Sequence, residues 1–412
     1  MTAGATVPAG HPRGSPGYRR LVAAVWAAAV GSFALLYAPQ ALLPLISSDL
    51  DVPPSTAALM VSVATGTLAL ALLPMSYLAD RVGRTRLMTV ALAVAALLGT
   101  LAPFAPSIEL LLVLRAAQGI ALAGLPALAM AHLSEEVRPS AVGVAMGLYV
   151  AGSTVGGLSG RVLSSMVAEV GGWRAGSAAV GVLGLLCVVA FRVLLPPPTA
   201  LPAAAPAARV GQLRRHLRDP GIQWLCLSAF VLMAAFVTVY NFLGYRLLAE
   251  PFGLSPALVG LVFLAYLAGT TSSPVAGQLG DRLGRRAVLL GGVLLALAAA
   301  LLTLSDLLPV VLLGLVLFTM GFFAAHTSAS GMVGNRARVG RAHATALYLL
   351  AYYAGSSLGG WLGGVVYERG GWAALVGYVA ALLVVALGLA LLLRRTPPLA
   401  AAPPVPAAPA AA

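Results

Sequence analysis

Long apolar stretches, separated by short polar loops, fill almost the whole chain. Each stretch runs for about 20 residues, the length that an α-helix needs to cross a lipid bilayer. A helix also satisfies its own backbone hydrogen bonds in lipid, so the pattern predicts membrane-spanning helices. Twelve are predicted, at 21–44, 57–78, 87–104, 108–132, 140–167, 174–195, 222–246, 256–276, 287–305, 309–333, 342–366 and 373–393.

The composition agrees with a membrane protein. The 412 residues are 60% hydrophobic and only 9% charged, with 46 glycines. A soluble protein could not cover that much apolar surface with charged groups. A cleaved signal peptide is not expected, because the first apolar stretch is long and no small-residue cleavage site closes it.

The net charge of +13 comes from arginine, since the chain contains no lysine. With the N-terminus in the cytoplasm, 20 of the 25 arginines fall in cytoplasmic segments. This bias orients membrane proteins, so a multi-pass protein of the inner (cytoplasmic) membrane is expected, with both termini in the cytoplasm. The basic charge then faces anionic lipid, and no nucleic-acid partner is indicated.

The longest interruption, at 196–220, divides the predicted helices into two groups of six. It is rich in proline and alanine and then basic at 214–218, which is typical of a cytoplasmic loop that ends in a short amphipathic helix. The predicted organisation is an N-terminal tail at 1–20, a bundle at 21–195, this loop, a bundle at 221–394 and a disordered Pro/Ala tail at 395–412.

Three motifs of the first group recur in the second at nearly constant offsets. The loop SYLADRVGR at 76–84 matches GQLGDRLGRR at 277–286, with their aspartates 201 positions apart. The segments GSTVGG and GSSLGG are offset by 203, and the two Gly-Gly-Trp segments by 199. The repeat therefore indicates a duplicated bundle, and such bundles are typically transporters with a site where the halves meet.

In these loops the chain resembles the major facilitator superfamily, in its drug:proton antiporter-like branch of bacterial arabinose-efflux-like permeases. The family's loop reads G-x-L-A-D-R-x-G-R-R/K; the second copy follows it closely, and the first has Ser76 for the opening glycine. The resemblance implies an all-α membrane protein with twelve transmembrane helices in two pseudo-symmetric six-helix bundles. It also implies a secondary transporter, with proton-coupled efflux of a small organic solute. The alternatives are a sugar or organic-anion permease without proton antiport and, more remotely, a non-transporting membrane sensor.

The resemblance gives the two Arg-rich loops a gating role. Asp80 would lie near the start of the helix at 342–366, and Asp281 near the start of the one at 140–167, each facing the positive end of that helix. The alternative is a pair of basic loops that only orient the protein in the membrane. The expected gating residues are Asp80, Arg81, Gly83, Arg84, Arg86, Asp281, Arg282, Gly284, Arg285 and Arg286.

A second family signature is matched by Arg115-Ala-Ala-Gln118-Gly119. By resemblance, Arg115 lines the cavity and takes part in proton or substrate coupling. A guanidinium is costly within a membrane and should face the bundle interior or water. The alternative is an arginine that extends to the membrane interface from near its helix end.

The family's antiporter signature, G-x-x-x-x-G-P-x-x-G-G, is matched at Gly147, Gly152, Gly156 and Gly157, but Ser153 replaces the proline. Without the kink that proline causes, the segment favours close helix packing firmly and antiport only weakly. The second half repeats the packing pattern with Gly355, Gly359 and Gly360.

Other polar residues within the predicted helices are candidates for the cavity wall or for coupling. Arg161 is a second costly charge, with extension to the interface as its alternative. His326 is an imidazole well within a helix that could titrate near neutrality. Each candidate, taken singly, is more often an interhelical hydrogen bond than a ligand contact. The remaining candidates are Tyr37, Gln40, Tyr240 and Asn241.

All twelve acidic residues fall in loops or at helix ends. A cavity with arginines and no carboxylate favours neutral or anionic substrates over cationic drugs. An ATP-driven pump is excluded, because its phosphate-binding loop requires a lysine. No enzyme active site, cofactor or metal site is indicated. The expected protein is a monomer whose partners are a small-molecule substrate, protons and membrane lipid.

Overall fold

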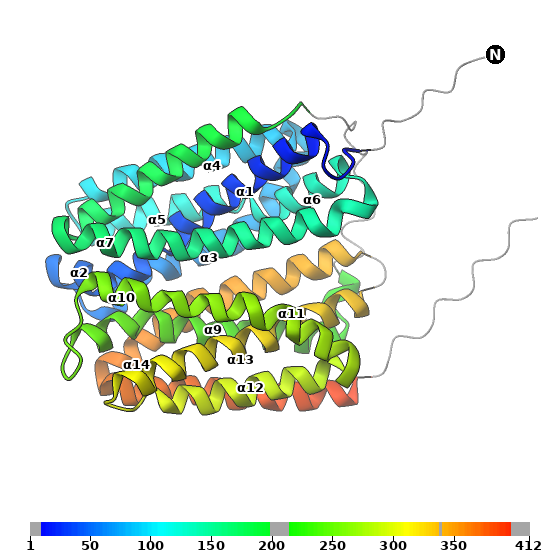
Figure 1. Ribbon diagram of the computed structural model, residues 1–412. Coiled ribbons are helices and arrows are strands. Elements are labelled where there is room, and N and C mark those ends of the chain that lie inside the picture. Colours follow the sequence, from blue (N-terminus) through cyan, green and yellow to red (C-terminus); the bar gives the residue numbers. More distant parts are fainter. Residues whose placement is uncertain (1–9, 198–213, 338–339, 397–412) are drawn as a thin grey trace, which may run out of the picture.

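The computed structural model describes residues 10–197, 214–337 and 340–396, and every long element in these ranges is a helix. Figure 1 shows the helices in two layers, α1–α7 and α9–α14, which we call the N-terminal and C-terminal halves. The N-terminal half contains α1 (Pro16–Tyr37), α2 (Pro39–Asp49), α3 (Pro54–Val82), α4 (Arg84–Leu101), α5 (Ile108–Leu122), α6 (Pro126–Glu136) and α7 (Pro139–Leu194). The C-terminal half contains α9 (Pro220–Leu248), α10 (Pro256–Val262), α11 (Tyr266–Leu283), α12 (Arg285–Leu302), α13 (Leu308–Arg336) and α14 (Arg341–Leu392).

Each of the two longest helices, α7 and α14, consists of two antiparallel arms joined at glycine. Backbone dihedrals are non-helical at Gly172 in α7 and at Gly370 and Gly371 in α14. The Tyr378 hydroxyl donates a 3.4 Å hydrogen bond to the carbonyl of Gly359, 19 residues earlier in α14. In a straight helix these residues would lie about 28 Å apart, so the chain must reverse between them.

Ten segments of the described chain are long and apolar enough to cross a membrane, and α7 and α14 are two of them. When their arms are counted separately, the described chain has the twelve spans that the sequence predicts. Three spans are interrupted: the first at Ala38, the fourth at 123–125, and the eighth by a 3₁₀ turn at Phe263–Ala265. Pro39 and Pro126 begin the second pieces of the first two, because proline cannot continue the hydrogen-bond ladder.

Both ends of the described chain lie at one end of the bundle, which we call the arginine-rich end (Figure 1). The two Arg-rich loops lie there as well, because six spans separate them and each span crosses the bundle once. The other end, which we call the opposite end, contains the turns at Gly172 and at Gly370–Gly371. This arrangement agrees with a duplicated bundle.

The two Arg-rich loops have the same backbone conformation. Gly83 has φ 89° and ψ 136°, and Gly284 has φ 87° and ψ 133°, each directly before the helix that follows. A residue with a Cβ atom rarely adopts such a positive φ. The turn itself therefore requires the glycine that both loops share.

Glycines at every fourth position bring the first span of each half close to its fifth. A Cβ atom on Gly156 would overlap the backbone of Val30, and one on Gly359 would overlap Ala234. This spacing is the small-xxx-small pattern that allows close packing of helices in membranes. Gly147 differs, because a Cβ atom there would meet open space. The other close pairs are Gly152 with Trp26, Gly160 with Ala34, Gly355 with Phe230 and Gly363 with Thr238.

The central loop is described only in part. Residues 198–213, and with them most of the predicted loop at 196–220, lie outside the described residues, as do 1–9 and 397–412 of the predicted tails. Residues 214–217 form one turn of helix within the segment predicted to be amphipathic. Asp219 then caps α9 and accepts a 2.6 Å hydrogen bond from Nε of Arg336, which lies at the end of α13.

Candidate functional site

A cavity of about 250 Å³ lies between the two halves. Phe236 and Tyr353, which line it, lie well inside their spans, away from both ends of the bundle. The wall is built by α1, α6 and α7 of the N-terminal half and by α9, α11, α13 and α14 of the other. The lining residues are Phe33, Tyr37, Pro126, Met130, Tyr149, Val150, Ser153, Thr154, Gly157, Arg161, Met233, Phe236, Tyr266, Phe323, His326, Leu349, Tyr352 and Tyr353.

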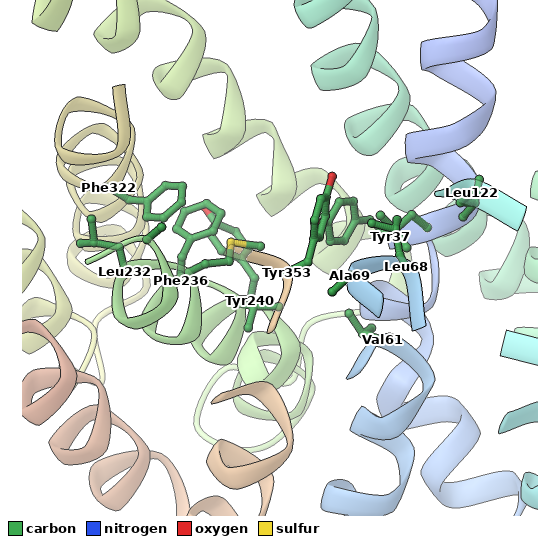
Figure 2. Packing of buried hydrophobic residues seen from close by; sticks show 14 of the residues in the cluster. Tyr37, Val61, Leu68, Ala69, Leu122, Leu232, Phe236, Tyr240, Phe322 and Tyr353 are labelled. Atoms are coloured by element: carbon green, nitrogen blue, oxygen red, sulfur yellow. The ribbon is translucent and has the colours of Figure 1, made fainter. Parts of the chain in front are cut away.

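Aromatic side chains form much of this wall. The ring of Phe236 stacks on that of Phe322 with centroids 3.9 Å apart, and it meets Tyr266 edge-on at 5.3 Å. In Figure 2 the side chain of Phe236 lies beside that of Phe322, and the side chain of Tyr37 lies beside that of Tyr353. Such surfaces bind flat or apolar ligands, while a few polar groups fix their orientation.

Arg161 places a positive charge in the wall and is only 1% exposed. Its Nε donates to Oε1 of Gln40 at 2.8 Å, and its Nη2 donates to the same oxygen. Nη2 also donates to the Tyr266 hydroxyl at 3.2 Å, and Nη1 donates to the Gly157 carbonyl at 2.6 Å. The guanidinium carbon lies 4.8 Å from the ring centre of Tyr37. All these partners are uncharged.

Gln40 and Asn241 extend this network across the interface between the halves. Nε2 of Gln40, in α2, donates a 2.7 Å hydrogen bond to Oδ1 of Asn241, in α9. Both side chains are fully buried. Within the described residues, Nδ2 of Asn241 has no hydrogen-bond partner, and neither does the buried hydroxyl of Ser62 nearby. Arg161 is thus connected to the C-terminal half both through Tyr266 and through Gln40.

Arg115 does not line the cavity, which corrects the prediction made from its signature. It is buried inside the N-terminal half, where Nε donates to the Met60 carbonyl at 2.7 Å. Nη1 and Nη2 donate to the carbonyls of Leu35 and Leu36 at 2.9 and 2.7 Å. Pro39 lacks the N–H that would otherwise pair with the Leu35 carbonyl, so the arginine supplies a donor there. Extension to the membrane interface is also wrong for this residue.

The rest of this signature also binds helices together. Gln118 accepts from Arg115, and its Nε2 donates to the Ala95 carbonyl at 2.8 Å. A Cβ atom on Gly119 would overlap the backbone of Ala64, so the glycine allows α5 to approach α3. The signature therefore joins α1, α3, α4 and α5.

The other predicted cavity residues divide between the wall and the layer behind it. His326 lies in the wall, and its Nδ1 is 3.0 Å from the Tyr348 hydroxyl. Tyr240 lies behind the wall, with its hydroxyl 2.6 Å from that of Thr319. Ser153, at the position of the missing proline, lines the cavity.

The contacts of Arg81, Arg84 and Arg285 in the two Arg-rich loops stay inside one half. Arg84 forms an ion pair with Glu135, and Arg285 pairs with Asp281 at 3.4 Å. Arg81 donates to the Tyr77 hydroxyl at 2.7 Å. Residues 338–339, before the span that Asp80 is predicted to meet, lie outside the described residues, so the gating contacts stay predictions. Arg86 and Arg282 are exposed.

At the opposite end, two glutamates join the halves. Glu169 of α7 accepts a 2.9 Å hydrogen bond from the backbone N–H of Ala257, at the start of α10. Glu368 of α14 accepts one of 2.7 Å from the backbone N–H of Ser55, at the start of α3. The two glutamates are 199 positions apart, the same offset as the Gly-Gly-Trp segments. We call these contacts the opposite-end latches; the positive end of each helix favours them.

Sequence reasoning missed both latches and most of the aromatic wall. A signal for the latches was present, because each glutamate comes two residues before a Gly-Gly-Trp segment. The aromatic residues carried no such signal, because aromatic side chains in apolar helices face lipid as well as cavities. The missed wall residues include Tyr149, Phe236, Tyr266, Phe323, Tyr352 and Tyr353.

Two matching halves of membrane-spanning helices around a shared central cavity define a membrane transporter. The chain belongs to the Major Facilitator Superfamily, whose family model matches residues 25–247 and 225–412. It is 38% identical to the MFS-type transporter YybF of Bacillus subtilis, over 93% of this chain and 96% of that protein. It is 39% identical to the inner membrane transport protein YnfM of Escherichia coli, over 91% of this chain and 90% of that protein.

Solved structures share this fold. A bacterial homologue of the human lysosomal transporter Spinster, in an inward-facing conformation, superposes with a TM-score of 0.76 at 18% identity, covering 93% of this chain and 98% of that one. The nucleoside transporter NupG superposes with a TM-score of 0.71 at 16% identity, covering 90% and 99%. At these identities the likeness concerns the fold alone. Since the family and these relatives are transporters, the protein is not an enzyme.

Proposed function

We propose that the protein is a secondary active transporter that carries a small organic solute through the central cavity by alternating access. The observation that carries this proposal is that both halves line the same cavity. When the two walls of a binding site belong to two bodies, a rocking movement between the bodies exposes the site to one side of the membrane at a time.

The arginine-rich end is proposed to face the cytoplasm, with both termini there. The arginines of the two loops, of the segment at 214–218 and of 394–395 all lie at this end. Arginine near membrane-spanning helices is retained on the cytoplasmic side. The relative YnfM is an inner membrane transport protein, which supports the same membrane for this chain.

The proposed mode is efflux coupled to protons. A chloramphenicol efflux pump of Mycobacterium tuberculosis is 26% identical over 57% of this chain, which supports the direction. His326 is proposed to bind the proton, because its imidazole nitrogen is a base that lines the cavity. The Tyr348 hydroxyl, 3.0 Å from Nδ1, holds the ring in place. A permease without proton antiport is the competing mode.

Transport in proteoliposomes under an imposed pH gradient tests this proposal. Sugars, organic anions and dyes would be screened, and flux of one of them should follow the gradient and stop when an ionophore collapses it. Solute flux that does not depend on the pH gradient would overturn proton antiport and support the permease without proton antiport. No flux of any solute across the screen would count against transport itself.

A further inference from the structure

We infer that the transported solute is a small organic anion with an aromatic or otherwise apolar body, whose carboxylate binds Arg161. This inference rests on the proposed function and specifies the substrate class of the same cavity. The observation behind it is a buried guanidinium that faces the cavity with no counter-ion.

The charge balance of the cavity is positive. All twelve acidic residues of the chain lie within the described residues, and none of them lines the cavity. The hydrogen-bond partners of Arg161 are an amide oxygen, a backbone carbonyl and a phenol. A buried charge is normally paired, because removing it from water is costly. Arg115 offers a contrast, since its donors are used by three backbone carbonyls and by Gln118, and it does not line this cavity.

The donors of Arg161 also have the geometry for a carboxylate. Nε and Nη2 lie along one edge of the guanidinium, and both donate to the single oxygen Oε1 of Gln40. A carboxylate offers two oxygens to that edge and forms two parallel, charge-assisted hydrogen bonds. Gln40 is therefore a neutral placeholder that an anion displaces. Its released Oε1 can accept from Nδ2 of Asn241, which has no hydrogen-bond partner in the part of the chain that the structure describes.

The aromatic residues of the wall indicate the chemical character of the rest of the solute. Tyr37, Phe236, Tyr266, Phe323 and Tyr352 present ring faces and edges to the cavity. A volume of about 250 Å³ is ample for a single-ring acid. A cation of the same shape would meet the Arg161 charge at short range in a poorly hydrated site, where repulsion is strong.

Three probes that share a phenyl ring and differ in charge test this inference. Benzoate is anionic at neutral pH, benzamide neutral and benzamidine cationic. Binding to the purified full-length protein would be measured by calorimetry and by the shift of the thermal unfolding midpoint. Benzoate should bind at least about tenfold more tightly than benzamide, the difference that a strong charge-assisted pair makes. Benzamidine should not bind.

Two variants and a matched control test whether Arg161 is the group that binds the carboxylate. Arg161→Gln should abolish the preference for benzoate over benzamide, whereas Arg369→Gln, at an exposed arginine of the opposite end, should keep it. Because Arg161→Gln can also weaken folding, Gln40→Leu provides an independent test. That change removes the competing acceptor, so benzoate should bind severalfold more tightly.

Equal binding of benzoate and benzamide, any binding of benzamidine, or a preserved preference in Arg161→Gln would overturn the inference. So would unchanged or weaker benzoate binding in Gln40→Leu. Flux of a neutral or cationic solute without benzoate binding would overturn the substrate class and leave the transporter intact. Benzoate binding with no flux of benzoate or any screened solute would leave the anion site and overturn the proposed function.

Discussion

Single glycines determine how closely the spans approach one another, and Gly156 provides the sharpest test. Its missing side chain lets α7 lie directly on the backbone of α1 at Val30. We expect Gly156→Ala to destabilise the protein by about 1–3 kcal/mol, because the added methyl group forces the two backbones apart. The thermal unfolding midpoint of the detergent-solubilised protein measures this effect.

Gly147 supplies the matched control for this prediction. It lies on the same helix, but a methyl group there meets open space. Gly147→Ala should therefore leave the unfolding midpoint unchanged or raise it slightly, since alanine favours the helix. If the two substitutions shift the unfolding midpoint equally, the effect of Gly156→Ala comes from helix propensity, and the close approach of α7 to α1 does not explain it.

Two arginines show what a sequence reveals about single residues and what it does not. Arg115 and Arg161 both stand alone in apolar helices, and the cost of a charge in lipid indicates that each must be buried or near water. Only packing shows that Arg115 pairs with carbonyls beside Pro39, while Arg161 faces the cavity. The family signature pointed to the wrong one of the two as a cavity residue, because a motif records which residues recur and not which way they face.

At the scale of the helices, the sequence predicts the number of spans well and their interruptions poorly. Span number follows from length and hydrophobicity, which the bilayer dictates. The break at Ala38 depends on Pro39 and on the donors that Arg115 brings from α5, a contact that no local pattern contains. The reversal at Gly172 needs a positive φ, and among 46 glycines the sequence does not show which one adopts it.

The start of α9 depends on pH through Asp219. Partial burial alone would raise the pKa of Asp219, but hydrogen bonds from Arg336 and from the N–H of Ile222 outweigh burial, so the pKa lies below its usual value. The carboxylate therefore adds stability that is complete above its unfolded pKa of about 3.9. This contribution is lost as the pH falls through the lower pKa of the folded protein.

Asp219→Asn tests this dependence. The variant should unfold at a lower temperature than the parent protein at neutral pH, because it loses the charge that pairs with Arg336. The difference should shrink below a pH of about 4, where the carboxylate becomes protonated in the unfolded parent chain, and should vanish below the lower pKa of the folded protein. Unfolding midpoints across this pH range measure it. A difference that stays constant down to strong acid would show that the side chain acts through packing and not through its charge.

The opposite-end latches predict how the halves separate at that end. Glu169→Gln or Glu368→Gln keeps a hydrogen-bond acceptor but removes the charge that favours the helix start. Each charge is partly solvated, so its loss should increase opening by about two- to fivefold. Ser62 is buried between α3 and α14, so a cysteine placed there becomes accessible only when this end opens. The opening is measured as the rate at which an impermeant maleimide, added outside intact cells, modifies that cysteine.

The background for this measurement lacks the native Cys187 and Cys226. Glu250→Gln is the control, since Glu250 is an exposed acid at the same end. Faster modification in both latch variants but not in the control is the expected pattern. An unchanged rate in the double variant Glu169→Gln, Glu368→Gln would show that the latches do not hold this end closed.

For the whole molecule, the duplication made the architecture predictable. Motif pairs at offsets of 199 to 203 reveal two copies of one bundle, and membrane topology then leaves few ways to arrange them. The position of the cavity follows from that symmetry, but its chemistry does not. The counterpart of Arg161 in the other half is Gly364. The arginine that we propose to bind the substrate is therefore a position at which the two halves differ.

A disulfide bond between the halves tests whether they must move for transport. A Cβ atom on Gly66 of α3 would lie 3.3 Å from that of Ser357 in α14, near the range of about 3.5–4.5 Å found in disulfides. In a background without native cysteines, oxidised Gly66→Cys, Ser357→Cys should lose transport, and a reductant should restore it. The pair Gly184→Cys, Ala96→Cys, with a corresponding separation of 3.2 Å inside the N-terminal half, should keep transport when oxidised. Full transport by the first pair with its disulfide formed would mean that substrate crosses without separation of α3 from α14.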